Sequence, residues 1–222
     1  MGVYPWEAAD GCHGGSPHLH TACTEGYVVV AGGGELQTRT PSGYTSVPLR
    51  AGTVAWFSPG TVHRAVNHGG LRVVVVMQNA GLPEAGDAVL TFPPDVLADA
   101  DRYRAAATLD PADPEVSARR RRDLAVAGFR TLRDHLVDGA PEPLLTLCRQ
   151  AAALVQPRAA AWRDIVAAGP AASVAASSRH IDALLEADGA HLRDAQVMAV
   201  DAPAPDDRAF GMCGRLDTYR TA

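Results

Sequence analysis

The sequence contains no lysine, because all twenty of its basic residues are arginine. This absence excludes a mechanism that passes through a Schiff-base lysine. The four cysteines lie far apart and form no CxxC pair, so the sequence indicates neither a zinc ribbon nor a disulfide framework. Few cysteines in such a pattern are typical of a reducing compartment, and we expect a cytoplasmic protein.

Long apolar runs and basic regions are also missing. No segment approaches the roughly 18 consecutive apolar residues of a membrane-spanning helix, and the first ten residues lack the basic and apolar parts of a secretory signal. The net charge is −5; residues 1–110 carry six arginines against ten acids, and residues 111–222 carry fourteen against fifteen. We therefore expect neither a nucleic-acid nor a membrane partner.

The first half of the chain is typical of short β-strands separated by glycine and proline. Gly32-Gly33-Gly34 and Pro41-Ser42-Gly43 predict turns between the first three strands. The strands are predicted at 27–31, 35–39, 44–49, 53–57, 62–67, 71–79 and 87–92.

From residue 113 onward the composition changes to alanine, leucine and arginine. Asp113 before Pro114 is typical of a helix start, and leucines spaced by four residues favour a helix over 114–138. Further helices are predicted at 142–155, 158–168 and 174–188, and strands at 196–200 and 209–216. Four consecutive arginines, 119–122, would spread around a helix. We expect a solvated turn paired with acids such as Asp123 and Glu115, with an anion or partner contact as the alternative.

Two short stretches contain the residue types of one metal site. His18 and His20 are two apart, so on a strand both side chains point to the same face. Glu25 lies at an odd separation from His20, which requires a bend or bulge between them. His63 follows about forty residues later, after a Pro59-Gly60 turn. Three imidazoles and one carboxylate are ligands that suit a divalent transition metal.

These stretches resemble the two motifs of the cupin superfamily. The first motif has the form HxH, four residues, Glu, six residues, Gly; the second has Gly, a proline-containing turn, Gly, two residues, His, three residues, Asn. The first is met by His18, His20, Glu25 and Gly32, and the second by Gly52, Gly60, His63 and Asn67. Cys12 stands where the first motif usually begins with glycine, and Pro59 is one place later than the usual proline.

The resemblance implies a cupin-type β-barrel (a jelly roll, or double-stranded β-helix) that holds a metal ion near one mouth. We expect this barrel over residues 1–110 and a mainly α-helical region over 111–222. The metal ligands would be His18, His20, Glu25 and His63. The ion would be iron, manganese, nickel, copper or zinc, with iron favoured.

The reaction is not determined by the motif, because one fold supports many activities. We expect an enzyme that acts on a small organic molecule, foremost a non-haem iron-type dioxygenase. A redox-neutral isomerase, cyclase or decarboxylase and a non-catalytic sugar-like binding or sensor protein are the alternatives. Tyr27 and Gln78 are candidate catalytic residues, because Tyr27 shares a strand face with Glu25 and Gln78 is polar among apolar neighbours. A homodimer is expected, since exposed barrel strands in such proteins often pair.

Overall fold

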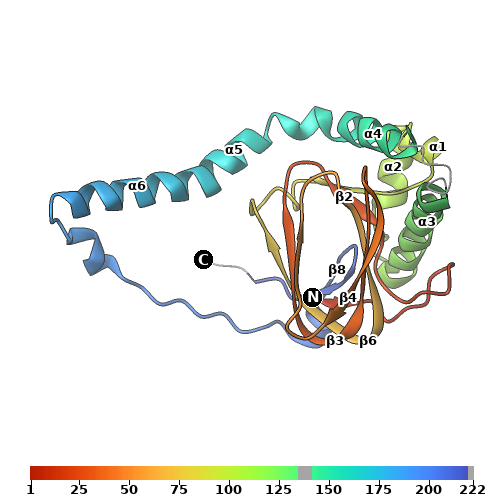
Figure 1. Ribbon diagram of the computed structural model, residues 1–222, viewed down its shortest axis with the longest axis horizontal. Helices are drawn as coiled ribbons and strands as arrows, with labels where there is room; N and C mark the ends of the chain where they lie inside the picture. Colours follow the sequence, from red (N-terminus) through yellow and green to blue (C-terminus); the bar gives the residue numbers. More distant parts are fainter. Residues whose placement is uncertain (135–141, 220–222) are drawn as a thin grey trace.

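The computed structural model describes residues 1–134 and 142–219. In these residues nine strands form one sheet, all of whose pairings are antiparallel, and the sheet curls around a buried interior (Figure 1). The strands are β1 (Gly2–Val3), β2 (His18–His20), β3 (Glu25–Thr40), β4 (Gly43–Arg50), β5 (Val54–Phe57), β6 (Val62–Met77), β7 (Ala88–Leu90), β8 (Ala209–Phe210) and β9 (Gly214–Leu216).

Helices follow the barrel strands and cover one side of the barrel before the chain projects away from it (Figure 1). They are α1 (Pro94–Leu97), α2 (Ala100–Ala107), α3 (Pro114–Asp134), α4 (Glu142–Ala159), α5 (Trp162–Val166), the π-helix η1 (Ala167–Ala171), α6 (Ala172–Leu185), and the 3₁₀ helices η2 (Ala190–Asp194) and η3 (Pro205–Asp207). A β-barrel followed by a mainly helical region is thus confirmed. Residues 135–138 of the helix predicted over 114–138 lie outside the described residues.

The predicted turn at Gly32-Gly33-Gly34 is wrong, because these glycines lie within the single long strand β3. The pairing of β3 with β6 shifts register between Val29 and Gly34, so the glycines bend the strand instead of reversing it. A Cβ on Gly34 would lie 2.1 Å from the carbonyl oxygen of Val66. Glycine is needed here for close approach of two backbones, which a sequence pattern does not distinguish from a turn.

Two hydrophobic clusters hold the fold together. One fills the barrel interior and includes Tyr27, Val29, Phe57, Leu71 and Val73. The other lies between the barrel and the helices, with members such as Leu19 and Val62 from the strands and Ala125, Phe129 and Leu147 from the helices. Residues 62–67 of β6 are buried on both faces for this reason. The second cluster therefore fixes the helical layer against the strands that carry the histidines.

The C-terminal strands return to the barrel. β9 pairs with β1, with Val3 opposite Gly214, and β8 pairs with β9. The strand predicted at 209–216 corresponds to β8 and β9, whereas residues 196–200 form no strand. The sheet thus contains residues from both ends of the sequence. The division of the chain into domains at residue 110 remains a prediction.

The arginine run at the start of α3 connects the helix to the barrel as well as to acids. The ion pairs of Arg119 with Glu115 and of Arg122 with Asp123 are present at 2.7 and 2.8 Å. However, Arg122 is buried and donates to the carbonyls of Trp6 and Glu7, and Arg121 donates to those of Ala107 and Gly211. The expectation of a solvated turn is wrong for these two arginines, since the helix packs across chain segments distant in the sequence.

No helix of the described residues is both long enough and apolar enough to cross a membrane. The absence of a long apolar run in the sequence led to the same expectation.

Candidate metal centre

Three strands bring the predicted ligands to one place inside the barrel. His18 and His20 lie on β2, Glu25 is the first residue of β3, and His63 is the second residue of β6. β2 pairs with β6 so that His18 lies directly opposite His63. The predicted bend between His20 and Glu25 is confirmed, because β2 ends at His20 and β3 begins at Glu25. The alternation of strands then directs all four side chains inward.

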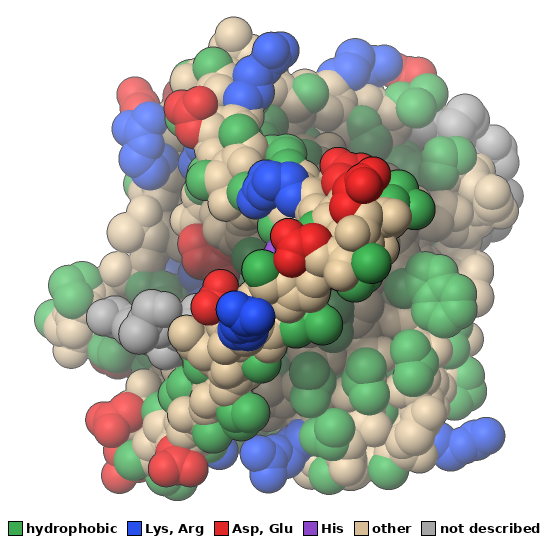
Figure 2. Space-filling model, turned by 90° about the vertical axis from the view of Figure 1, so that its left-hand side faces the viewer, with side chains coloured by type: hydrophobic (Ala, Val, Ile, Leu, Met, Phe, Trp, Pro, Cys, Tyr) green, Lys and Arg blue, Asp and Glu red, His purple; other side chains and the backbone are tan. Residues whose placement is uncertain are grey.

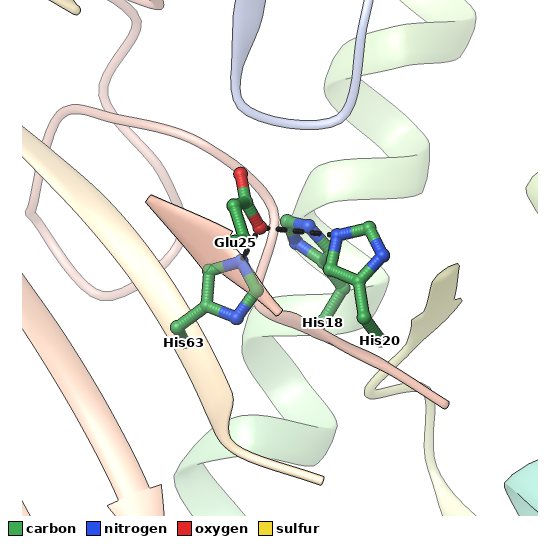
Figure 3. Close-up of side chains that lie close together, drawn as sticks. All are labelled: His18, His20, Glu25 and His63. Atoms are coloured by element: carbon green, nitrogen blue, oxygen red, sulfur yellow. Dashed lines mark ion pairs between the residues drawn. The ribbon is translucent and has the colours of Figure 1, made fainter. Parts of the chain in front are cut away.

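The four ligand atoms of this cluster lie within 4.8 Å of one another. Glu25 Oε2 is 3.0 Å from the Nε2 atoms of both His20 and His63 (Figure 3). The cluster is inside the protein, since its residues are between 0% and 6% exposed. Four donor atoms that converge in a buried space are arranged as the ligands of a single ion are.

Each histidine is held by the ring nitrogen that points away from the cluster. His18 Nδ1 is 2.9 Å from the carbonyl oxygen of Ser16, and His63 Nδ1 is 3.1 Å from that of Thr61. Because a carbonyl can only accept, Nδ1 carries the proton in both rings and donates. The Nε2 atom of each ring is then the unprotonated nitrogen, which is the form that binds a metal ion.

His20 is held by a carboxylate instead of a carbonyl. Its Nδ1 is 3.0 Å from Oδ2 of Asp87, whose side chain is fully buried. Asp87 also accepts hydrogen bonds from the backbone N–H groups of Thr21, Ala22 and Cys23, so it stabilises the bend that follows β2. Sequence reasoning missed Asp87, because only the antiparallel pairing of β7 with β2 places it beside His20.

Two buried polar atoms of the cluster have no hydrogen-bond partner among the described residues. These atoms are Glu25 Oε2 and His63 Nε2. They lie 3.0 Å apart without the geometry of a hydrogen bond. Leaving buried polar atoms unpaired is costly, and a cation between them would satisfy both. The donor set and these unpaired atoms therefore fit a divalent transition metal ion.

The protonation states of His18 and Glu25 agree with such a site. Burial lowers the pKa of His18 far below its usual value, and the neighbouring His63 and His20 lower it further, so this ring is neutral. Burial alone would raise the pKa of Glu25, but the facing His63 and His20 outweigh burial and hold the carboxylate ionised. Burial also opposes the charged form of His20, yet the hydrogen bond with Asp87 and the nearby carboxylate of Glu25 raise its pKa to about 9.

Tyr27 lies beside the cluster, as its position on the face of Glu25 predicts. Its side chain is fully buried, with its ring centroid 6.3 Å from that of His63 and 5.4 Å from that of Phe57. The hydroxyl donates toward Sγ of Cys213 at 3.8 Å. Burial raises the pKa of Tyr27 well above its usual value, so the phenol keeps its proton.

Cys213, the residue before β9, lies beside His18, and sequence reasoning missed it. Its Sγ is 3.9 Å from Nδ1 of His18, although the two residues are 195 positions apart. Burial raises the pKa of this thiol to about 12. No sequence motif surrounds this cysteine, so only the return of the tail to the barrel identifies it as a neighbour of His18 and Tyr27.

Gln78 lies apart from the cluster. It follows β6 immediately, is exposed, and uses its Oε1 to accept the backbone N–H of Thr24 at 3.2 Å. The alternation of β6 directs Met77 toward the side of Glu25 and places Gln78 on the opposite side. Its position thus gives no support to the catalytic role predicted for it.

Comparison with known families supports the interpretation of the strands and motifs. Residues 6–77 match the family model of the cupin domain. The matched residues, which contain β2 to β6, are a cupin domain. Its four-residue cluster lies where both cupin motifs meet, on β2, β3 and β6. No curated protein matches the sequence.

Solved structures similar to the cupin domain share little sequence with it. CapF, a capsular polysaccharide assembling protein of Staphylococcus aureus, is 18% identical, with 35% of this chain and 23% of that chain covered and a TM-score of 0.31. QdtA, a sugar 3,4-ketoisomerase of Thermoanaerobacterium thermosaccharolyticum, is 15% identical, with coverages of 39% and 64% and a TM-score of 0.32. The TDP-quinovose 3,4-ketoisomerase WlaRB of Campylobacter jejuni is 10% identical, with coverages of 36% and 60% and a TM-score of 0.30. The chain spans less than two thirds of each.

Proposed function

We propose that the chain is a metal-dependent enzyme that acts on a small organic molecule. His18, His20, Glu25 and His63 are the proposed ligands. The observation that carries the proposal is the convergence of four buried ligand atoms within 4.8 Å of one another. Two of them, Glu25 Oε2 and His63 Nε2, have no hydrogen-bond partner among the described residues. An ion held by these four side chains would supply a centre that can also bind a substrate or oxygen.

Within this class we propose a non-haem iron-type dioxygenase, which adds both atoms of dioxygen to its substrate. A bound iron ion supplies a centre where electrons pass from substrate to dioxygen. The walls beside the ligands favour this reaction over a redox-neutral isomerisation. Tyr27 and Cys213 both hold their protons at neutral pH, so neither is a ready base for moving a proton between carbon atoms.

The protein's own groups have distinct proposed tasks. Glu25 stays ionised and the imidazoles of His18 and His63 present Nε2, as the hydrogen bonds of their Nδ1 atoms require. Tyr27 is a hydrogen-bond donor whose partner is only a distant sulfur, so its O–H is available to a substrate oxygen. Phe57, whose ring centroid is 4.2 Å from that of His63, excludes water from that side.

The proposal is tested on protein purified without added metal. We expect close to one equivalent of metal per chain, with iron foremost, and uptake of dioxygen with at least one member of a panel of aromatics, thiols and hydroxy acids. His63→Ala should lose both, whereas the exposed His68→Ala should keep both.

Each other result identifies an alternative. No metal, even after reconstitution with the five candidate ions, would refute the site. Bound zinc with substrate isomerisation and no oxygen uptake would replace the dioxygenase by a redox-neutral enzyme. Stabilisation by a sugar-like ligand without any turnover would indicate a binding or sensor protein. A cytoplasmic location remains a prediction.

A further inference from the structure

One segment of the chain projects from the molecule without packing on it. This arm, residues 167–207, contains η1, α6, η2 and η3. It begins after α5, where Trp162 is buried and its Nε1 donates to the carbonyl of Ala85 at 3.3 Å, and it ends at β8, whose partner β9 is paired with β1. Figure 1 shows the arm leaving the helical layer, extending far from the barrel and returning to it. Both of its ends are therefore fixed while its middle has no support.

The arm exposes apolar side chains to solvent, which is unfavourable in water. None of its residues is buried. Val174, Ile181 and Leu185 form a stripe along one face of α6 and are 67%, 59% and 77% exposed, and in the extended part Val197 and Met198 are 98% and 73% exposed. Most of the stability of a helix in a protein comes from the packing of its apolar face, and α6 has no buried residue. The arm thus has an apolar face that lacks a partner among the described residues of its own chain.

The barrel has an unpartnered apolar face of its own. This sheet patch consists of Val30, Val54, Trp56, Val74 and Val76, which are between 51% and 74% exposed. It is continuous across β5, β3 and β6, because Trp56 and Val76 both pair with Gly26, and Val54 and Val74 both pair with Val28. Figure 2 shows the side toward which the arm projects, with hydrophobic side chains exposed on it. A contiguous exposed patch of this kind marks an interaction surface.

The charges of the two surfaces are complementary. The arm carries seven acids (Asp182, Glu186, Asp188, Asp194, Asp201, Asp206, Asp207) and two arginines (Arg179, Arg193), a net charge of 2 − 7 = −5. Residues 36–83, which include most of the strands around the sheet patch, contain no acid at all. Their exposed charges are those of Arg50 and Arg72. An acidic arm and an acid-free sheet are expected to attract each other.

A second copy of this chain would supply a partner both for the apolar face of the arm and for the sheet patch. α5, η1 and α6 follow one another without a gap from Trp162 to Leu185, so the helical part of the arm points away from its own sheet (Figure 1). A two-fold axis would place each arm on the sheet patch of the other copy and close the assembly. The 41 residues of the arm exceed the roughly 20–30 residues per side of a stable interface.

We propose that the protein is an arm-exchanged homodimer, in which residues 167–207 of each copy pack through α6 across Val30, Val54, Trp56, Val74 and Val76 of its partner. This inference is independent of the proposed function, because it rests on surfaces away from the metal ligands.

Light scattering on the full chain tests the dimer. We expect a mass twice that of the 23.2 kDa chain. Ile181→Asp with Leu185→Asp on the arm, and separately Trp56→Asp on the sheet patch, should each raise the dissociation constant by about 30-fold or more, as removal of a central interface residue does. Val116→Asp is the matched control, since Val116 is 47% exposed on α3 and outside both surfaces; it should leave the dimer unchanged.

A mixing experiment tests the exchange itself. Neither the arm variant nor the sheet-patch variant retains a complete arm-to-sheet contact in its own homodimer. A mixed pair retains one, formed by the intact arm of the sheet-patch variant and the intact sheet patch of the arm variant. We therefore expect the equimolar mixture to form heterodimers at concentrations where each variant alone is monomeric.

Several results would overturn the proposal: a monomeric wild type throughout the micromolar range, an arm variant that stays fully dimeric, or a mixture that shows no heterodimer. Persistence of dimers in the arm variant alone would indicate direct pairing of the sheets. If an aspartate variant fails to show native circular dichroism, Ile181→Ser with Leu185→Ser replaces it under the same criteria.

Discussion

Asp87 and His20, 67 residues apart in the sequence, are joined by a buried contact of 3.0 Å between Oδ2 and Nδ1. Because an ionised carboxylate only accepts, it keeps the proton of the imidazole on Nδ1 and turns Nε2 toward Glu25. The same carboxylate binds the backbone of the bend between β2 and β3. One side chain thus sets both the tautomer of a ligand and the path of the chain to the next ligand.

Asp87→Asn should weaken metal binding by about 10–100-fold, the range found when such partners of a ligand are lost. The amide would place an N–H group against Nδ1 of His20 and favour the tautomer with its proton on Nε2. Competition with a chelator at fixed pH measures this change. Asp95→Asn, an exposed residue paired with Arg102, is the control and should bind metal normally. Equal affinities of Asp87→Asn and wild type would contradict the positioning role.

Metal affinity should rise with pH up to about 9. In the metal-free protein the hydrogen bond with Asp87 and the nearby carboxylate of Glu25 raise the pKa of His20 to about 9, against a usual value of 6.5. Metal binding must displace this proton, so the apparent affinity should increase about tenfold per pH unit between neutrality and pH 9 and then level off. Metal titrations at several pH values check the slope. A slope of zero over that range would contradict the protonation state inferred for His20.

The metal-free protein should show the opposite trend in its stability. A group whose pKa is raised on folding stabilises the protein fully below its unfolded pKa, here 6.5, and this contribution is lost as the pH rises through about 9. The free energy of unfolding of the metal-free chain is therefore expected to fall between these values. Asp87→Asn should reduce the fall, and urea unfolding at matched pH values would detect it.

Asn67→Ala should lower the free energy of unfolding by at least about 2 kcal/mol, because buried groups left unpaired cost about 1–3 kcal/mol each. Its amide donates to the carbonyl of Val3 at 2.9 Å, and its oxygen accepts the N–H groups of Gly69 and Leu71 at 2.9 and 3.1 Å. Asn79→Ala is the matched control, since the side-chain amide of Asn79 makes only a long contact, of 4.0 Å, with Cys23 Sγ. Equal unfolding midpoints for the two variants would refute this role of Asn67.

Gly128→Ala should also destabilise the protein, by about 1–3 kcal/mol, as overpacking does. A Cβ at this position of α3 would lie 2.1 Å from the carbonyl oxygen of Thr91, so helix and strand segment would have to separate. Gly169→Ala meets nothing within 4 Å and should leave the unfolding midpoint unchanged or slightly higher. A Gly128→Ala protein as stable as wild type would show that α3 can shift without cost.

Local patterns in the sequence predicted the strands better than their connections. Residues 27–31 and 35–39 were both expected to be strands, but they belong to one strand, β3, because the intervening glycines permit close backbone contact instead of a reversal. The two strands predicted at 62–67 and 71–79 likewise fall in a single strand, β6. Two short helices, α1 and α2, were missed, since each is too short to show a periodic pattern of apolar residues.

The spacing of His18, His20, Glu25 and His63, together with strand alternation, was sufficient to predict the barrel and the group of ligand types, because these depend on local geometry and on a motif. The tertiary structure decided the rest. Asp87, Cys213 and the buried arginines of α3 acquire their positions through antiparallel pairing and through the return of the tail. Such contacts join residues far apart in the chain, and no local periodicity records which distant partner a side chain will meet.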